Sequence, residues 1–451
     1  MKKGLLLLLA FANLFICVSF AGCADESTQT SNKENDIIQN SNTQVIEIIE
    51  MCANELLEPD RENATARTVA YGANNFAFRL SAALATHIGT SNFVCSPFSV
   101  WLPLAALVNA TDNQKKADML SALYAVGISE ADLNTAASRM LYDLTNQNGQ
   151  RFATEQNMVP HDPLRIANAI FVGKNVTLRR DFAQTFLDYY RGQAINVDFN
   201  SIEAVDAVND WASENTEGLI TEVINALDPE TVAAIANAIY FSDRWEWEFD
   251  PDETTEDKFH SPVGDTTAFF MLREGDNQVY YEDDVVQAMR LRFKTGGSLN
   301  ILLPKDGNAT ALLTSMTSKY FEEIQRDSIL ATVRLLLPRF SVESGVMQLA
   351  DTLDLLGVPL FDKEAAPLTG GLIEEELPVW LSGALHCALI EVDEKGTTAA
   401  AVTALYTPGA SIPEPTETFE MVCNRPFVFV LCSNTYDGGN QVLFTGIVNT
   451  Q

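Results

Sequence analysis

Histidine is scarce in this chain, and the motifs of the common hydrolases and nucleotide-binding enzymes are missing. The 451 residues include four histidines, which are His87, His161, His260 and His386. None lies in an H-E-x-x-H pattern, and neither a G-x-S-x-G elbow nor a G-x-x-x-x-G-K-[ST] loop occurs. Acidic residues are plentiful, but without a motif no pair of them stands out as general acid and base. His386 lies in an apolar stretch, LSGALHCALIEV, and is predicted to be a satisfied core histidine. The sequence therefore gives no support to an enzyme.

Positive charge is also in short supply. The chain has 29 Lys and Arg against 61 Asp and Glu, a formal net charge of −32, and a pI of about 4.3. Affinity for nucleic acid and for anionic membrane surfaces depends on cationic side chains. We therefore expect neither partner, and attribute the acidic surface to solubility.

Cysteine lacks the spacings that would give it a structural or catalytic role. The seven cysteines contain no C-x-x-C pair and match no zinc pattern. Two of them, Cys17 and Cys23, fall in the N-terminal leader described next, and the five that remain are an odd number. Most of those five lie in apolar runs and are expected to be buried free thiols. We expect no disulfide framework, no metal and no cofactor.

The N-terminus has the features of a secretory leader. The stretch MKKGLLLLLAFANLFICVSFAGC begins with two lysines, continues as an apolar run to Phe20, and ends in small residues before Cys23. The ending FAGC resembles a bacterial lipobox, so residues 1–22 are predicted to be a signal peptide and Cys23 to carry the lipid. Phe20 stands where Leu is usual, which keeps an ordinary cleaved signal peptide open as the alternative. Residues 23–67 are predicted to form a polar tether, and residues 43–57 within it have a helical composition without an assignable role.

Beyond about residue 68, helical and strand patterns alternate without a repeat. Apolar residues recur at helical spacing in YGANNFAFRLSAALATHI and SIEAVDAVNDWASE. RPFVFVLCS is continuously apolar, as expected of a strand buried on both faces. Further predicted strands are ATVRLLLPRFSV, LNILLPK and QVLFTGIV. Helices in the first half and strands crowded into the second predict an α+β domain with large sheets.

One stretch near the C-terminus is unusual for so acidic a protein. In EVDEKGTTAAAVTALYTPGASIP, residues 396–413 carry no charge, although proteins usually interrupt strand-prone runs with charges. The stretch resembles the hinge of the serpins, protease inhibitors that act by a conformational trap. Further segments resemble the family in the right order: NFVCSPFSV, RIANAIFVGKNVTLRRDF, AVNDWASENTEGLI, IANAIYFSDRWEWEF, LPRFSVESGVMQLADTLDLLGVPLF, NRPFVFVL and VLFTGIV.

The resemblance covers residues 68–451. It implies the α+β serpin fold, with three β-sheets, about eight to nine helices, and an exposed reactive-centre loop at residues 394–415. The chain departs from the family at NATDNQ (residues 109–114), at Ser242 and Asp243, and after Asn449, where no Pro follows. We treat these as loop and terminus changes that leave the fold unaltered.

The hinge composition agrees with what the resemblance implies, which is insertion of the cleaved loop into the main sheet as a new strand. Alternate residues of a strand face opposite sides, so one face of the inserted run would turn toward the core. That face would hold Thr397, Ala399, Ala401, Thr403 and Leu405. All are uncharged, and an unpaired charge buried there would cost several kcal/mol. The alternative is a flexible surface loop that happens to be alanine-rich.

By resemblance the hinge comprises Glu394, Gly396, Thr397, Ala399, Ala400, Ala401 and Thr403. Gly396 precedes the run, where the backbone must bend as insertion begins. The family's usual spacing from Glu394 places the cleaved bond between Ala410 and Ser411. The neighbourhood TPGASIP is small and neutral, which favours elastase-like or subtilisin-like proteases over trypsin-like ones. Tyr406 and Thr407 remain alternative cleavage points, because the segment after Ala410 is longer than in many relatives.

A polar gate beneath the insertion point is also implied by the resemblance. It comprises Ser96, Ser99, Asn209 and His386, and Trp245 would lie near the top of the sheet where insertion starts. Plain packing is the alternative role for each of these residues.

Three functions follow for comparison. The first is a monomeric serine protease inhibitor, secreted or displayed outside a bacterial cell as a lipoprotein. It would form a covalent acyl complex with its target and touch the membrane only through its lipid; cysteine proteases stay open as a second target class. The second is a non-inhibitory binding lipoprotein of the same fold. The third, a secreted hydrolase, lacks an identifiable nucleophile and base.

Overall fold

Nine α-helices and two networks of paired strands lie in the part of the chain that the computed structural model describes, which is residues 9–20, 48–49, 64–147, 164–226, 230–396, 418–434 and 439–451. The helices are α1 (Ala64–Ala85), α2 (Pro97–Leu107), α3 (Asn113–Ala122), α4 (Glu130–Tyr142), α6 (Arg180–Tyr190), α7 (Ile202–Asn215), α8 (Ala309–Ser315), α9 (Ser318–Asp327) and α10 (Ala350–Leu355). Three short helical turns add η1 (Val108–Ala110), η2 (Asp143–Gln147) and η3 (Pro251–Glu253).

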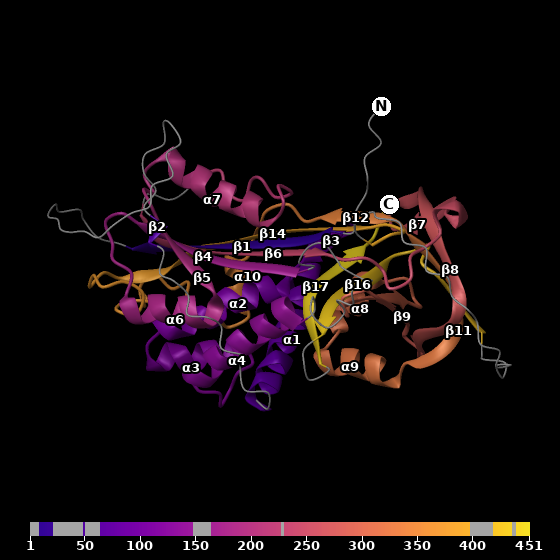
Figure 1. The fold of residues 1–451 in the computed structure, drawn as a ribbon, viewed down its shortest axis with the longest axis horizontal. Helices are drawn as coiled ribbons and strands as arrows, with labels where there is room; N and C mark the ends of the chain where they lie inside the picture. Colours follow the sequence, from indigo (N-terminus) through magenta and orange to yellow (C-terminus); the bar gives the residue numbers. More distant parts are fainter. Residues whose placement is uncertain are drawn as a thin grey trace.

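The main sheet runs across the middle of the molecule (Figure 1). Its strands follow the order β12 (Phe340–Glu343), β14 (Val379–Val392), β1 (Leu9–Phe20), β6 (Thr231–Ser242), β4 (Leu164–Gly173), β5 (Gly192–Val197) and β2 (Ile48–Ile49), and β13 (Met347–Gln348) also pairs with β14. Only β4 and β5 pair in parallel; the other pairs are antiparallel. Strands β6 and β14 are buried along nearly their whole length, as strands covered on both faces must be.

The second network contains the two remaining sheets, joined through one long strand. Its order is β15 (Thr418–Val422), β11 (Ile329–Pro338), β8 (Gly264–Glu282), β9 (Val286–Arg292), β10 (Ser298–Pro304), β16 (Phe427–Asn434), β17 (Asn440–Val448) and β3 (Phe93–Cys95), with β7 (Thr255–Ser261) paired to β8. The first part of β8 pairs with β7 and β11, and its last residues pair with β9. The continuously apolar run at β16 is buried, as its sequence predicts.

Helices cover the main sheet on both faces, most of them on one side. Helix α7 lies over one face, where Trp211 meets Phe171 of β4 edge-on, with ring centroids 6.1 Å apart. Helices α1, α2, α4 and α6 lie on the opposite side (Figure 1), and every residue of α2 is buried there. Strands β14 and β6, which lie on either side of β1, are therefore sandwiched between helical layers.

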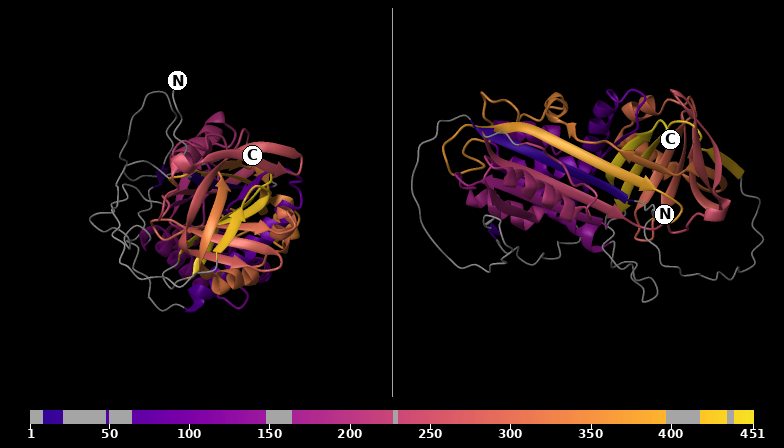
Figure 2. Two further views of the ribbon diagram at one scale, coloured as in Figure 1. Left: turned by 90° about the vertical axis from the view of Figure 1, so that its right-hand side faces the viewer. Right: turned by 90° about the horizontal axis from the view of Figure 1, so that it is seen from above.

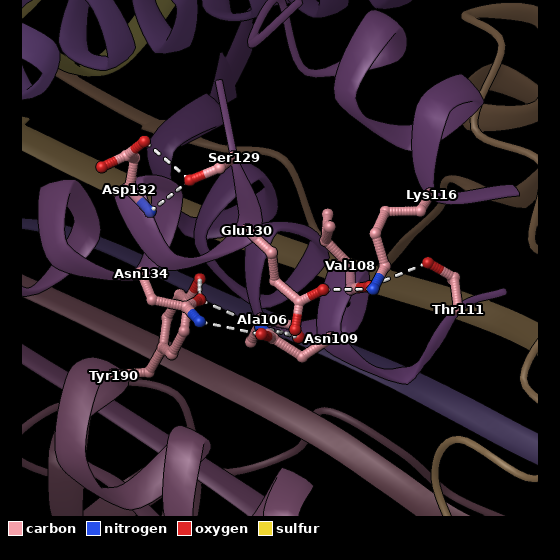
Figure 3. Close-up of polar contacts among 10 residues, drawn as sticks. All are labelled: Ala106, Val108, Asn109, Thr111, Lys116, Ser129, Glu130, Asp132, Asn134 and Tyr190. Carbon is pink, nitrogen blue, oxygen red and sulfur yellow. Dashed lines mark hydrogen bonds and ion pairs between the residues drawn. The ribbon is translucent and has the colours of Figure 1, made fainter. Parts of the chain in front are cut away.

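The departure NATDNQ forms a well-bonded corner of this helical layer (Figure 3). Asp112 caps α3 by accepting from the Lys115 backbone N–H, and Lys116 pairs with Glu130 at the start of α4. The Asn109 amide exchanges hydrogen bonds with Asn134 of α4, which also accepts from the Tyr190 hydroxyl. The glycine-rich turn of the family is thus replaced by side-chain capping, and the fold is unchanged.

The segment predicted as a signal peptide contributes a central strand. Leu9–Phe20 forms β1, which lies between β14 and β6 and runs antiparallel to both (Figure 2). Residues 48 and 49, in the stretch without an assigned role, add a short strand to the outer edge of β5. Among the described residues, no helix is long and apolar enough to cross a membrane.

Candidate functional site: the mouth of the main sheet

The hinge begins where β14 ends. Strand β14 stops at Val392, and residues 393–396 turn away from it beside residues 243–245, which follow β6. We call these two turns, residues 243–245 and 393–396, the mouth of the main sheet. Backbone bonds join them, since Trp245 N–H donates to the Lys395 carbonyl at 3.2 Å.

Gly396 is the one position in the mouth that tolerates no side chain. Its φ of 77° lies in the left-handed region. A Cβ there would come within 2.5 Å of the Trp245 nitrogen and 2.6 Å of the Asp243 carbonyl oxygen. The bend that the sequence predicted at Gly396 is therefore required by both conformation and close approach.

Trp245 is the packed centre of the mouth. Its ring is fully buried and stacks on Phe293 with centroids 4.6 Å apart, and it meets Phe249 edge-on. Its indole Nε1–H donates to the Asp393 carbonyl oxygen at 2.9 Å. A single side chain thus joins the end of β14 to the turn that follows β6.

Glu394 is held by a cation beneath the hinge. Arg339, between β11 and β12, contacts the Glu394 carboxylate through Nε and through an Nη2–Oε1 distance of 2.6 Å. The Thr254 hydroxyl donates to the same carboxylate. Burial alone would raise the pKa of Glu394, but these hydrogen bonds outweigh it and hold the pKa below its usual value.

Two more carboxylates, Asp243 and Asp393, are buried in the mouth, and neither was predicted from the sequence. Asp243 is 1% exposed and accepts from the backbone N–H and hydroxyl of Thr295 and from the Arg244 N–H. Burial raises the pKa of Asp243 to about 6, and burial likewise raises the pKa of Asp393 to about 6. The change at Asp243 leaves the fold unaltered, as predicted, but it places a buried carboxylate in the mouth that the sequence did not reveal. The signal was an acidic residue where Gly is common, two positions before a Trp.

Further along β14, the structure brings three of the four gate residues together. His386 is fully buried, and its Nε2 accepts from the Ser96 backbone N–H at 3.0 Å. The Ser96 hydroxyl donates to the Leu443 carbonyl and accepts from Ser99 N–H, so Ser96 also caps α2. Asn209 bonds instead to the backbone of Val223 and Ile224, where it orders the segment after α7. The prediction of a satisfied core histidine at position 386 is confirmed.

The family comparison agrees with this geometry. The family model described as Serpin (serine protease inhibitor) matches residues 71–450. The chain belongs to the serpin family. It is homologous to α1-antitrypsin-type inhibitors, which are not enzymes. An α1-antiproteinase from Callosciurus caniceps is 28% identical over 82% of this chain and 87% of its own. An α1-antitrypsin from Meriones unguiculatus is 29% identical over 79% and 85%.

Solved serpin structures have the same architecture. The thermophilic serpin tengpin in its native state superposes with a TM-score of 0.71 at 25% identity, over 90% of this chain and 99% of its own. Human thyroxine-binding globulin gives 0.71 at 22% identity, over 86% and 99%, and so shows the fold alone. The predicted α+β fold with three sheets is confirmed.

The rest of the predicted serpin hinge lies outside the described residues. It comprises Thr397, Ala399, Ala400, Ala401 and Thr403. Ala410 and Ser411 of the predicted cleaved bond and Cys23 of the predicted lipid site also lie outside the described residues. Of the cysteines within the described residues, Cys95, Cys423 and Cys432 are buried free thiols, as predicted, and Cys387 is buried as well. In the part of the chain that the structure describes, no three His, Cys, Asp or Glu side chains form a group that could hold a metal ion.

Proposed function

We propose that this serpin traps serine proteases by inserting its cleaved loop into the main sheet. One observation carries the proposal. The chain turns at Gly396 against Trp245 at the mouth, and the run that follows has no charge from residue 396 to residue 413. A strand that enters a sheet covered on both faces must bury one of its own faces, and an unpaired charge there would cost several kcal/mol.

The target class follows from the residues around the cleaved bond. Cleavage is proposed between Ala410 and Ser411, with Tyr406 and Thr407 as alternatives. A small neutral residue on the acyl side suits the narrow pockets of elastase-like and subtilisin-like enzymes. No Lys or Arg lies between Lys395 and Arg425, which disfavours trypsin-like ones. The protein acts as a monomer, with cysteine proteases as a further class to be tested.

The proposed reaction begins as ordinary proteolysis. The protease serine attacks the Ala410 carbonyl, the bond to Ser411 breaks, and the new amine of Ser411 leaves with the C-terminal part. The acyl enzyme then moves with the loop as the loop inserts, and its active site is distorted before water can release it. The uncleaved inhibitor must be kinetically stable rather than at equilibrium.

The test is to mix the chain from residue 24 onward with elastase-like, subtilisin-like, chymotrypsin-like and trypsin-like enzymes. Denaturing gels should show a stable complex with the first two, and mass spectrometry should locate the cut after Ala410. Cleavage of the loop without any complex across the whole panel would refute the trap.

A matched pair of substitutions tests the insertion itself. Thr397→Arg places a charge on the face predicted to turn inward, so it should convert the inhibitor into a substrate and lower the complex yield roughly tenfold or more. Thr398→Arg carries the same charge on the outward face and should keep the yield within about twofold. Equal yields from the two variants would show that the facing assignment is wrong.

A non-inhibitory binding protein of the same fold is the second candidate. It is favoured by one finding, which is that the fold also belongs to thyroxine-binding globulin. Such a protein would be cleaved by the panel without complex formation, and cleavage would leave its thermal stability unchanged.

We propose the protein's cellular location from its N-terminal leader, residues 1–22, and from Cys23, which follows it. Lipid on Cys23 would hold the serpin domain, residues 68–451, outside a bacterial cell through the tether of residues 23–67. Mass spectrometry of the mature N-terminus decides this: a diacylglycerol mass on Cys23 supports the anchor, and an unmodified N-terminus elsewhere contradicts it.

A further inference from the structure

Strand β1 fills the place beside β14 completely. Its pairs with β14 run from Leu9 opposite Glu391 to Phe20 opposite Val379, with one register shift. Its pairs with β6 run from Leu9 opposite Ser242 to Ser19 opposite Thr231, also with one shift. In this chain β6 and β14 are thus joined through β1 over nearly their whole length (Figure 2).

No other edge of β14 is open to a new strand. Its opposite edge pairs with β12 and β13. A strand that continues from β14 through the turn at residues 393–396 would run antiparallel to β14, and β1 already runs in that direction on the remaining edge. The loop can therefore join the sheet beside β14 only if β1 leaves.

The two competing segments are chemically alike. LAFANLFICVSF in β1 has no charge and no proline, and the run from Gly396 to Thr407 has none either. Strand β1 also passes the gate, since Leu14 is the register partner of both His386 and Asn237. One position in the sheet thus has two candidate occupants from the same chain.

We propose that the leader strand β1 holds the full-length chain in a self-inhibited state, and that removal of residues 1–22 vacates the position that the cleaved loop needs. This inference rests on the proposed trapping function. The precursor would be unable to trap proteases before export, and the same cleavage that frees Cys23 would activate it.

The position of β1 can be tested without any protease. Cys17 lies opposite Ala234 of β6, and directly opposed residues have Cβ atoms close enough for a disulfide. Ala234→Cys in the leader-bearing chain, refolded in a glutathione redox buffer, should form a Cys17 disulfide that peptide mapping detects. Ile235→Cys is the matched control, because residue 235 is opposite Ile16 and points to the other face. No disulfide with Ala234→Cys, or equal yields from both variants, would refute the pairing.

The self-inhibition is tested with two lengths of chain. Residues 24–451 should form covalent complex with a subtilisin-like protease, whereas the full chain should be cleaved in its loop and give at least about tenfold less complex. Phe15→Lys/Ile16→Lys in the full chain should restore trapping, because adjacent residues face opposite sides and one lysine must enter the core. Ser27→Lys/Thr28→Lys makes the same charge change beyond β1 and should leave the full chain inhibited.

The outcomes separate the two proposals. Complex from both lengths in equal yield refutes self-inhibition and leaves the trapping function standing. Complex from neither length, across the protease panel, refutes the trapping function and the self-inhibition with it. In either case the disulfide pair still decides whether residues 9–20 lie between β6 and β14.

Discussion

Two parts of β14, its middle at His386 and its C-terminal end at the mouth, are held by different kinds of contact. At His386 the contacts are neutral: a backbone N–H donates to the imidazole, and a serine hydroxyl caps the helix below it. At the mouth, Asp243, Asp393 and Glu394 are all buried around a single tryptophan. Neutral contacts are insensitive to pH, whereas buried carboxylates weaken the structure when they ionise without strong partners. The mouth is therefore the end from which the sheet is expected to open.

The largest effect should come from Trp245, whose side chain joins the two sides of the mouth. Trp245→Ala removes the stack on Phe293 and the bond to the Asp393 carbonyl, and should lower the free energy of unfolding by about 3–5 kcal/mol. Trp247→Ala is the matched control, because that ring is 53% exposed and its loss should cost less than about 1 kcal/mol. Urea unfolding of both variants measures the difference. Similar losses would mean that the mouth does not depend on the buried ring.

The next largest effect is a dependence of folding stability on pH. The folded-state pKa of Asp243 is about 6, above its ordinary value of 3.8, so the native state binds the extra proton between these values. Stability should therefore rise by about 1 kcal/mol as pH falls from 7 to 5, and by on the order of 3 kcal/mol in all once the pH is below 3.8. Asp393 acts in the same direction. Glu394 opposes it only below about 4.5, where its depressed pKa begins to cost stability.

Asp243→Asn isolates that contribution. The variant should lose about half of the gain in thermal stability between pH 7 and pH 5, because Asp393 supplies the rest, whereas Asp252→Asn, at an exposed site in η3, should keep all of it. An unchanged profile for Asp243→Asn would show that the buried carboxylate is not what responds to pH.

The fold followed from the sequence because its evidence was spread over many segments. The apolar run at β16, the helical periodicity of α7 and the capped Ser-Pro start of α2 each fix a local structure, and their order fixes the family. Gly396 was predicted from the need for a bend, and the close approach of Trp245 supplies the reason.

The sequence was less informative where a residue's role depends on distant neighbours. Asp243 resembles a loop residue in the sequence, and only the structure shows that Thr295, in the turn between β9 and β10, donates two hydrogen bonds to it. Arg339 was recognised only as part of a strand motif, because its partner Glu394 lies 55 positions away. The apolar leader was predicted from its composition alone, and composition cannot reveal that the same residues pair with both β14 and β6.

A smaller effect tests whether charge pairing holds the mouth. Arg339 and Glu394 form an ion pair in which the carboxylate is buried and the guanidinium is partly exposed. A double-mutant cycle with Arg339→Ala and Glu394→Ala should give a coupling free energy of about 1–2 kcal/mol, reduced from the buried-pair range by solvent screening of the arginine. The coupling should decrease as pH falls below about 4.5, because Glu394 of the unfolded chain takes up a proton there while the paired carboxylate, with its lowered pKa, stays ionised until lower pH. A coupling near zero at pH 7 would mean that packing, not charge, positions Glu394.

The smallest effect on stability is expected at the neutral contacts around His386. Two buried serines one helical turn apart, Ser96 and Ser99, test it. Ser96→Ala removes the bond to the Leu443 carbonyl and the cap on α2, so it should cost about 1–2 kcal/mol while sparing the backbone bond to His386. Ser99→Ala removes a buried hydroxyl for which the described residues provide no hydrogen-bond partner. It should therefore be neutral or slightly stabilising. Thermal unfolding of the two variants at pH 5 and pH 7 should show the same difference at both, because the bonds lost from the Ser96 hydroxyl, to the Leu443 carbonyl and the Ser99 N–H, involve no carboxylate. A difference that changes with pH would show that the gate responds to charge as the mouth does.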